Sequence, residues 1–419
     1  MLSLKYIKEN IDLVKRSIIQ KNVDCNLDEI IDLDQKRISI IQTVEQMKAT
    51  RNSINNKISD YKKSNKNTDN LISDMKDLST DIKDNDNELN AILIELNEKL
   101  LYVPNIVNED VPIGDETENL IIREWGQKPK YDFDIKDHKT LCELNSLVDF
   151  KRGAKISGAG FPLYTNKGAK LERSLINFML DAHTSNGYEE LFPPFLVSPT
   201  SPKTTGNLPK FKDDMYYIEN DNLYCIPTAE VPITNMHRDE QFLEIDLPKK
   251  YVAYSSCFRR EAGSYGKDTK GLLRLHQFNK VELVKFVHPD ESYRELELLL
   301  GDAEKILQSL NLHYRVVVLA SGDLSFSAAK CYDIEVWSPF ENKYLEVSSC
   351  SNFESFQSSR GNMKFRNNST GKLEYIHTLN GSGLATPRLF VSLLETYQNK
   401  SGEIDFPEIL LKYINSSNV

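Results

Sequence analysis

The segment 258–282 carries the side chains best suited to chemistry on an anionic ligand. If both of its ends are β-strands, side chains two positions apart share a face. Positive charge on such a face suits phosphate or carboxylate groups, and an aromatic ring supplies a stacking surface. An exposed hairpin of mixed charges is the alternative interpretation. The pattern therefore predicts a charged face with one aromatic platform, made of Arg259, Glu261, Arg274, Phe278 and Glu282.

The loop between these two ends is rich in glycine and contains two lysines, Lys267 and Lys270. Glycines give the backbone freedom to move, and the lysines supply positive charge. The loop is therefore expected to meet an anion.

The elements that must position these residues lie in the last three quarters of the chain. The pattern predicts helices at about 166–186, 291–310 and 387–398, with strand-like runs at 251–254, 281–287 and 314–319. Strands that are close in sequence, with helices grouped between them, favour a mainly antiparallel sheet with helices packed against it. Neither G-x-G-x-x-G nor G-x-x-x-x-G-K-[ST] occurs, which argues against the two common phosphate-loop folds.

The first hundred residues have a different character. They contain no proline before Pro104 and no glycine before Gly114, which is typical of long helices. Residues 1–26 are expected to form one amphipathic helix. Beyond it, residues that are apolar except for Arg37, Arg51 and Asn85 follow steps of three and four from Leu33 to Tyr61 and from Leu71 to Leu96, as in a heptad repeat. The polar stretch 62–70 separates the two seams, so they predict an antiparallel coiled-coil arm of roughly 40 Å.

The function of this arm is open at this point, because a coiled coil commonly serves dimerisation or spacing. Its charges are unevenly placed: the second helix is acidic, whereas the end of the first helix and the turn are basic. A basic edge at the tip could contact nucleic-acid phosphates. A plain solvated face is the alternative. The lysines concerned are Lys48, Lys57, Lys62, Lys63 and Lys66.

Composition excludes several classes of protein. The 419 residues are 40% hydrophobic and 27% charged, which is unlike a disordered chain. The net charge of −10 means that any nucleic acid must be bound by a local basic patch. Six cysteines without a C-x-x-C pair argue against a disulfide framework and a zinc site. No apolar run is long enough for a membrane span, so a cytoplasmic protein is expected.

The segment 258–282 resembles motif 2 of the class II aminoacyl-tRNA synthetases, with F-R-x-E, a loop and R-x-x-x-F-x-x-x-E all present. Residues 187–196 resemble motif 1, with Pro194 as its proline, and residues 380–388 resemble motif 3, with Arg388 as its arginine. The sequences T-A-E at 228–230, G-S-Y-G at 263–266 and E-V-S-S-C-S-N at 346–352 are similar to the seryl-tRNA synthetase family. The resemblance covers essentially the whole chain.

This resemblance implies an α+β fold: an N-terminal antiparallel coiled-coil hairpin, then a class II catalytic domain built on a mainly antiparallel β-sheet flanked by helices. It implies a tRNA-binding domain at 1–110 with its arm at about 30–101, and a catalytic domain at 111–419. The implied activity is ATP-dependent activation of L-serine and its transfer to tRNA(Ser), with tRNA(Sec) as a further candidate. The implied assembly is a homodimer with motif 1 at the interface.

The resemblance also assigns residues. Arg259 and Arg388 are expected to be catalytic, and Mg²⁺ to bind with ATP at Glu346 and Ser349, which requires a bulge or strand end near Val347 because residues three apart face opposite sides of a regular strand. Thr386 is expected to cap the helix that carries Arg388. The serine-binding residues are Thr228, Ala229, Glu230, Glu282 and Ser382. The ATP-binding residues are Arg259, Arg260, Glu261, Arg274, Phe278, Glu346, Val347, Ser348, Ser349 and Arg388. The tRNA-binding residues are Lys48, Lys57, Lys62, Lys63, Lys66, Lys267 and Lys270.

Two rival interpretations remain open. A paralogue that aminoacylates a carrier protein would share the catalytic motifs, but the heptad-rich arm with its basic tip argues against it. A non-catalytic RNA-binding or scaffold descendant is expected to lack Arg259, Glu282 or Arg388, and all three are present.

Overall fold

A computed structural model describes residues 1–261 and 270–415 of the chain. Contacts divide it into two compact units. One consists of Leu2–Ile18 and Asp24–Val103, and the other of Met1, Ile19–Val23 and the chain from Pro104 onward. None of the helices in the described residues combines the length and the apolar character that a membrane span requires.

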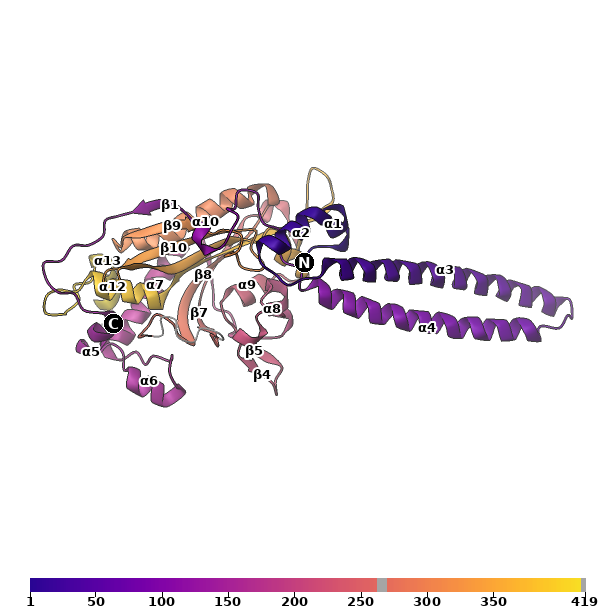
Figure 1. Cartoon of the computed structure of the whole chain (residues 1–419), viewed down its shortest axis with the longest axis horizontal. Coiled ribbons are helices and arrows are strands. Elements are labelled where there is room, and N and C mark those ends of the chain that lie inside the picture. The colour runs from indigo at the N-terminus through magenta and orange to yellow at the C-terminus, as the bar shows by residue number, and fades with distance from the viewer. Residues whose placement is uncertain (262–269, 416–419) are drawn as a thin grey trace. The chain divides into compact units, whose positions relative to one another are not determined.

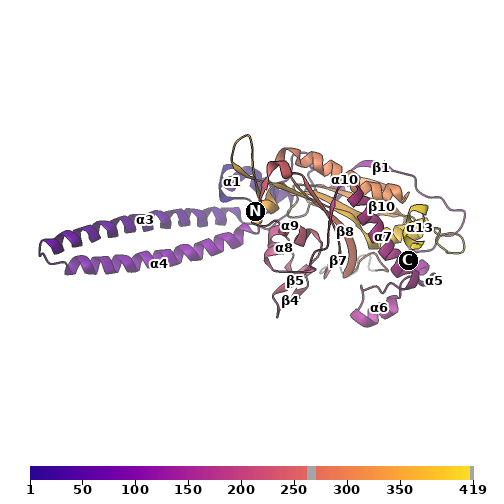
Figure 2. The ribbon, with the colours of Figure 1, turned by 180° about the vertical axis from the view of Figure 1, so that it is seen from behind.

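The first unit is built around two long helices, α3 (Leu27–Lys63) and α4 (Asp69–Leu100). They run antiparallel and side by side in Figures 1 and 2. The 37 residues of α3 span about 55 Å, more than expected, because the helix begins well before the first seam residue. The single helix predicted over 1–26 is wrong: it is divided into α1 (Leu4–Glu9) and α2 (Ile11–Gln20), with the backbone of Asn10 out of helical conformation.

The predicted heptad seams are the faces along which these helices bury side chains. Val44, Ile58, Ile82 and Leu96 are each at most 8% exposed, and Tyr61 at the tip is the exposed member of the two seams. Between helices, contact of apolar side chains at this spacing is what holds a coiled-coil hairpin together. The arm is therefore confirmed as a coiled coil.

The second unit is built on a sheet of eight strands, counted among the described residues. Neighbouring strands are antiparallel, except that the edge strand Glu189–Leu191 runs parallel to its neighbour. The predicted mainly antiparallel sheet is therefore confirmed. In spatial order the strands are β1 (Leu120–Trp125), β9 (Tyr314–Val318), β10 (Lys330–Ser338), β11 (Lys343–Asn352), β14 (His377–Ala385), β8 (Gln277–Val287), β7 (Lys249–Phe258) and β2 (Glu189–Leu191).

Two small sheets and several helices complete this unit. The small sheets are β13 (Leu373–Tyr375), β12 (Lys364–Arg366) and β6 (Gln241–Leu243), and β3 (Leu196–Val197), β5 (Leu223–Cys225) and β4 (Tyr217–Ile218). The helices are α5 (His138–Leu144), α6 (Phe150–Ser157), α7 (Asn166–Ser185), α8 (Thr200–Thr205), α9 (Glu230–Asn235), α10 (Ser292–Ser309), α11 (Phe356–Arg360), α12 (Thr386–Thr396) and α13 (Glu408–Asn415). Short 3₁₀ turns are found at Glu116–Glu118, Lys212–Asp214, Glu244–Asp246 and Pro289–Glu291.

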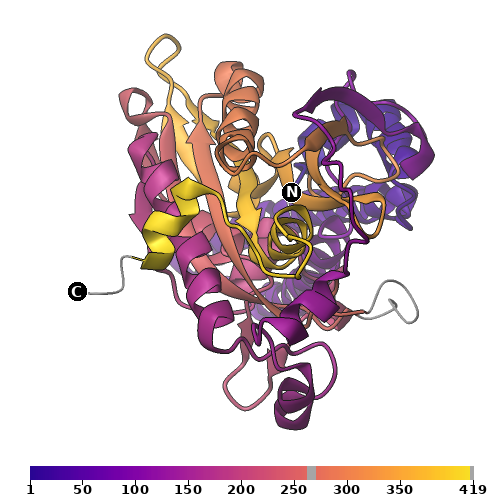
Figure 3. The same ribbon diagram turned by 90° about the vertical axis from the view of Figure 1, so that its left-hand side faces the viewer.

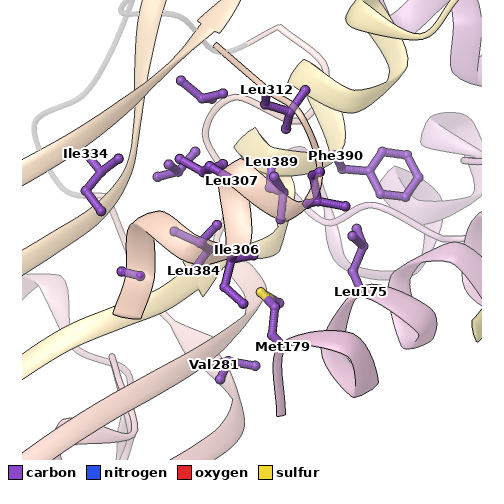
Figure 4. Close-up of a cluster of buried hydrophobic side chains, with 14 of the residues drawn as sticks. Leu175, Met179, Val281, Ile306, Leu307, Leu312, Ile334, Leu384, Leu389 and Phe390 are labelled. Atoms are coloured by element: carbon purple, nitrogen blue, oxygen red, sulfur yellow. The ribbon is translucent and has the colours of Figure 1, made fainter. Parts of the chain in front are cut away.

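The main core fills the space between the sheet and the helices α7, α10 and α12. The orange helix α10 and the yellow helix α12 lie next to the strands in Figure 3. Figure 4 shows Val281 of β8 and Leu384 of β14 meeting Ile306 of α10, Leu389 of α12 and Met179 of α7. The side chains of β8 that alternate with Val281, at positions 278, 280 and 282, point to the other face. One strand therefore supplies both the core and a polar face.

Two helical glycines should respond in opposite ways to alanine. Gly301 of α10 has open space where a Cβ would lie, so Gly301→Ala should raise the free energy of unfolding by about 0.5–1 kcal/mol. A Cβ on Gly168 of α7 would lie 2.0 Å from the carbonyl oxygen of Leu147, so Gly168→Ala should lower it by about 1–3 kcal/mol. Urea unfolding followed by the fluorescence of Trp125 and Trp337 would measure both changes. A stabilising Gly168→Ala would contradict this packing.

Candidate active site

A cavity of about 720 Å³ lies on the polar face of the main sheet. Its walls come from β8, β11 and β14, from the start of α12, and from the segments at 227–230, 259–261 and 272–275. Most of the residues that the sequence predicts for ATP and serine meet here, although they lie as much as 160 positions apart in the chain. The predicted residues that line the cavity are Thr228, Glu230, Arg259, Glu261, Arg274, Phe278, Glu282, Glu346, Val347, Ser349, Ser382 and Arg388.

The expected strand geometry around Arg259 and Glu261 is wrong, although both residues line the cavity. Strand β7 ends at Phe258, and Glu261 has a left-handed backbone with φ of 51°. The guanidinium of Arg259 lies 5.2 Å from the ring centre of Phe278. Arg274, which precedes β8, donates from Nη1 to Oε2 of Glu261 over 2.7 Å. A turn thus brings two arginines and an aromatic ring together where a strand was predicted.

Deeper in the cavity, Glu282 is fully buried and its carboxylate is held from two sides. Its Oε1 accepts a hydrogen bond of 2.8 Å from Nδ2 of Asn380, and Oε2 forms an ion pair with Lys280. Lys280 also donates to Oγ1 of Thr228 over 2.9 Å. Ser382 lies directly opposite Glu282 in the pairing of β14 with β8. These groups form a small polar end of the cavity that offers both hydrogen-bond donors and acceptors.

A second carboxyl group, that of Glu230, belongs to the same end of the cavity. Its pKa is raised to about 7, first by burial and then by the negative charge of Glu282, while a hydrogen bond from Gln357 opposes the shift. That hydrogen bond runs over 2.6 Å from Nε2 of Gln357 to Oε1 of Glu230. Near neutral pH this site therefore holds one carboxylate in an ion pair and a second carboxyl group that is ready to change its charge.

The bulge that was required near Val347 is present. Ser348 pairs with Ile334 and Glu346 pairs with Glu335, which leaves Val347 without a partner residue in β10. Because of this extra residue, Glu346 and Ser349 both line the cavity although they lie three positions apart. A carboxylate and a hydroxyl oxygen are donors that suit a hard cation such as Mg²⁺, so these residues fit the predicted metal.

Arg388 lies in the first turn of α12 and spans the gap between two walls of the cavity. Its Nη1 donates to the carbonyl oxygen of Glu346 over 2.8 Å and lies 3.1 Å from the Oε2 atom of the same residue. Its Nε donates to the carbonyl oxygen of Leu273 over 3.5 Å. The arginine is thus held in the cavity by partners that an incoming phosphate could replace.

The expected helix cap at Thr386 is wrong. The N-cap residue of α12 is Ala385, and the hydroxyl of Thr386 donates to Oε1 of Glu172 on α7. The same oxygen accepts a hydrogen bond of 2.9 Å from Asn279, the residue after Phe278. Burial raises the pKa of Glu172 to about 7. The hydroxyl therefore connects the motif 3 segment with α7, the helix that precedes the motif 1 segment.

Some predicted residues do not reach the cavity wall. Ala229 is packed in a buried apolar cluster, and Ser348 is buried, with Oγ donating to the carbonyl oxygen of Ser382 over 2.7 Å. Arg260 is exposed, and its backbone N–H donates to the carbonyl oxygen of Asp214 over 2.8 Å. Lys270 forms an ion pair with Asp137 at 3.2 Å, and Lys267 lies outside the described residues. The binding roles assigned to them stay predictions.

Sequence reasoning missed a number of residues that line the cavity, among them Lys280 and Asn380. A signal for Lys280 was available, because it lies two positions from both Phe278 and Glu282 and must share their face on a regular strand. Asn380 lies two positions before Ser382 on β14, so the same argument applies to it.

In the first unit, the five tip lysines are all exposed. Lys48 lies 3.7 Å from Asp86 of α4, and Lys63 lies 3.9 Å from Asp60. The ammonium group of Lys66 lies 5.4 Å from the ring centre of Tyr61. The basic edge therefore stays accessible, although part of its charge is balanced by nearby carboxylates.

Comparison with known proteins first identifies the class. Residues 210–397 match the family model described as the tRNA synthetase class II core domain (G, H, P, S and T). Residues 1–107 match the model described as the Seryl-tRNA synthetase N-terminal domain. Nearly all residues that line the cavity lie within this match, so the second unit contains a class II aminoacyl-tRNA synthetase core.

Relatives that align over the full length of the chain identify its family within this class of synthetases. The chain is 53% identical to a Serine--tRNA ligase of Chloroherpeton thalassium, with 99% of each chain covered, and 50% identical to one of Chlorobium luteolum, with 100% and 99% covered. A seryl-tRNA synthetase from Pyrococcus horikoshii complexed with ATP is similar in structure, with a TM-score of 0.92 and 35% identity, covering 99% of this chain and 98% of that chain. The chain belongs to the seryl-tRNA synthetase family.

The two buried carboxyl groups of the cavity should affect stability with opposite signs. Because the pKa of Glu230 is raised from 4.5 to about 7 in the folded chain, its ionised form destabilises the fold. This cost is absent below pH 4.5 and is fully present above about pH 7. Glu230→Gln should therefore raise the free energy of unfolding at pH 8 by about 1–3 kcal/mol, with no gain near pH 4.5.

Glu282→Gln is the matched comparison for this prediction. It leaves the buried Lys280 without its ionic partner, so it should destabilise the fold at pH 8 by about 3 kcal/mol. Urea titrations of both variants at pH 5 and pH 8 would measure these effects. The same sign for both variants at pH 8 would contradict the described charge arrangement.

Proposed function

We propose that this chain catalyses the reaction of a serine--tRNA ligase. The carboxylate of L-serine attacks the α-phosphorus of ATP, a new C–O–P linkage forms, and the bond to pyrophosphate breaks. A ribose hydroxyl at the 3′ end of tRNA(Ser) then takes the seryl group, and AMP leaves. The observation that carries this proposal is the convergence of Arg259, Arg388, Glu282 and Phe278 on one cavity. Its volume of about 720 Å³ suits a nucleotide with a small amino acid.

The nucleotide would occupy the part of the cavity between motif 2 and motif 3. Phe278 would stack on the adenine ring and Glu261 would accept from its amino group. Arg259 would hold the α-phosphate and the reacting carboxylate, and Arg274 and Arg388 would bind the outer phosphates. Because Arg274 and Arg388 already hold Glu261 and Glu346, ATP binding would exchange these carboxylates for phosphate oxygens as partners of the two arginines. Positioning and charge neutralisation are the catalytic effects of these residues.

Serine would bind at the polar end of the cavity. Glu282 and Glu230 would accept from its ammonium and hydroxyl groups, with Thr228 and Ser382 completing the pocket. Alanine would leave buried polar groups unpaired, and a larger side chain would not fit. Ala229, Arg260, Val347 and Ser348 would contribute as backbone or supporting positions.

Mg²⁺ would be held by Glu346 and Ser349 together with phosphate oxygens. When bound, it supplies positive charge that neutralises the triphosphate. The protein residues keep the donor atoms on one side of β11 through the bulge at Val347.

Several further parts of the proposal concern assembly and location. Residues 1–110 would form the tRNA-binding part, with its arm at about 30–101, and residues 111–419 the catalytic part. A homodimer would form through motif 1, where Phe192 is 78% exposed beside a second cavity of about 410 Å³. The cytoplasm is the proposed location, and tRNA(Sec) is a second candidate acceptor.

Amino-acid-dependent pyrophosphate exchange tests the reaction. Among the amino acids of a panel, serine alone should support rapid exchange. Arg388→Ala should lower the rate by roughly 30- to 1,000-fold, because it removes charge-assisted contacts to phosphate. Arg294→Ala removes an exposed arginine that pairs with Glu291 at 2.6 Å, and it should leave the rate unchanged. Exchange with another amino acid, or a parental rate in Arg388→Ala, would overturn the proposal.

The tRNA role of the arm has its own test. Replacing residues 30–101 by a short linker should leave serine-dependent exchange near normal, because the cavity contains no residue of the arm. Aminoacylation of tRNA(Ser) should fall steeply.

Charge variants within the intact arm refine this experiment. Neutralising the five tip lysines should weaken tRNA binding and make the dependence of log affinity on log salt shallower. Neutralising five carboxylates of α4, at Asp74, Asp77, Asp81, Asp84 and Glu88, should not weaken it. Normal aminoacylation by the truncated protein would show that the coiled coil serves spacing or assembly.

A further inference from the structure

The segment 270–274, which leads from the motif 2 loop into β8, is anchored from behind by the start of α5. The backbone N–H of Leu272 donates to Nε2 of His138 over 3.3 Å. Gly271 has a left-handed backbone with φ of 66°, and a Cβ at this position would lie 2.2 Å from the same ring nitrogen. Lys270 forms an ion pair with Asp137, the N-cap residue of α5, at 3.2 Å. Three consecutive residues of the segment therefore contact two consecutive residues of α5.

The hydrogen bonds of His138 determine its tautomer. A backbone N–H can only donate, so Nε2 must be the acceptor and the ring proton must reside on Nδ1. The Nδ1 atom lies 3.2 Å from Oε1 of Glu395, in the last turn of α12, and donates to it. Both side chains are fully buried. The imidazole is thus fixed in a single orientation with its acceptor nitrogen facing Leu272.

Glu395 is in turn held by four donors. Its Oε1 atom accepts from Nδ1 and from the backbone N–H of His138, and its Oε2 atom accepts from the hydroxyl of Ser338 and from the backbone N–H of Phe340. A carboxylate that is buried with this many donors is well compensated for the loss of water. The glutamate therefore provides a rigid support for the histidine.

This cluster resembles a metal site in composition only. His138, Glu341 and Glu395 place ligand atoms within 4.8 Å of one another. Both ring nitrogens of the histidine already have partners, and four donors occupy the carboxylate of Glu395. The hydrogen bonds thus account for the arrangement of these residues.

The anchored segment forms part of the cavity wall. Leu272, Leu273 and Arg274 all line the cavity. The carbonyl oxygen of Leu273 accepts from Arg388, and Arg274 pairs with Glu261. A shift of the backbone at Leu272 would therefore displace two arginines that face the same space.

We propose that His138, supported by Glu395, is a positioning residue that fixes the backbone of 270–274 and thereby places Arg274 and Arg388 for the triphosphate of ATP. The inference rests on the proposed function in that ATP is taken as the ligand of the cavity. His138 itself does not line the cavity and acts through the backbone of Leu272.

Calorimetric titration with Mg²⁺-ATP, without any amino acid, tests this inference. His138→Leu removes the acceptor and should weaken ATP binding roughly tenfold, about the contribution of one well-placed hydrogen bond. In His138→Gln the side-chain oxygen can accept from Leu272, so this variant should bind within about threefold of the parent. In pyrophosphate exchange, His138→Leu should raise KM for ATP and leave KM for serine unchanged, a split that a loss of folded protein would not produce.

His313→Leu is the matched control. His313 is also buried, at 7% exposed, and also uses both ring nitrogens, to the carbonyl oxygen of Trp125 and the hydroxyl of Tyr344, but it lies outside the cavity wall. This variant should lose stability without losing ATP affinity. Equal weakening in both leucine variants, or parental affinity in a folded His138→Leu, overturns the inference.

A second variant tests the inference if His138→Leu does not fold, and the choice of assay separates this inference from the proposed function. If His138→Leu does not fold, Gly271→Ala replaces it, because the added Cβ displaces the ring from Leu272 and should weaken ATP binding to a similar extent. Parental ATP affinity in that variant overturns the inference. Because ATP binding is measured without amino acid, failure of serine to support exchange would overturn the proposed function and leave this inference standing.

Discussion

The alternation of side chains along β8 is the constraint on which both the core and the cavity depend. Val281 and Leu283 pack against the helices, while Phe278, Lys280 and Glu282 face the cavity. A shift of one residue in the pairing of β8 with β14 would bury the charges and expose the apolar side chains. The apolar face therefore fixes the register, and the register places the charges. On β11 a bulge at Val347 interrupts the alternation, so that Glu346 and Ser349 both face the cavity.

Three ion pairs are formed within the cavity before any ligand enters. Glu261 holds Arg274, Glu346 holds Arg388, and Lys280 holds Glu282. An arginine without such a partner would be free to turn toward solvent. A buried carboxylate without a partner would lower the free energy of unfolding. Glu230 is the contrast, because its hydrogen-bond partner is the neutral side chain of Gln357, and burial and the charge of Glu282 raise its pKa. The acids of the site thus keep Arg274, Arg388 and Lys280 oriented.

Much of the fold and of the cavity could be predicted because the relevant signals are local or periodic. The heptad seams predicted the coiled-coil arm. The spacing of Glu346 and Ser349 predicted a bulge in their strand, and this bulge is present. The path of the chain at Glu261 could not be predicted, because a left-handed backbone at a non-glycine residue leaves no periodic trace. The pairing of Thr386 with Glu172 and the contact of His138 with Leu272 join positions more than 130 residues apart. Such contacts are set by tertiary packing, which a single sequence does not encode in its spacing.

The ion pair of Arg388 with Glu346 makes the two charges of this wall depend on each other. A phosphate group alone would satisfy Arg388 and leave the carboxylate of Glu346 facing a like charge. A divalent cation alone would satisfy Glu346 and leave the guanidinium without its acceptor. A ligand that brings both charges replaces the pair completely, so each of the two components favours the entry of the other. By reciprocity the coupling free energy between an anionic and a cationic component at this pair would be the same in both directions.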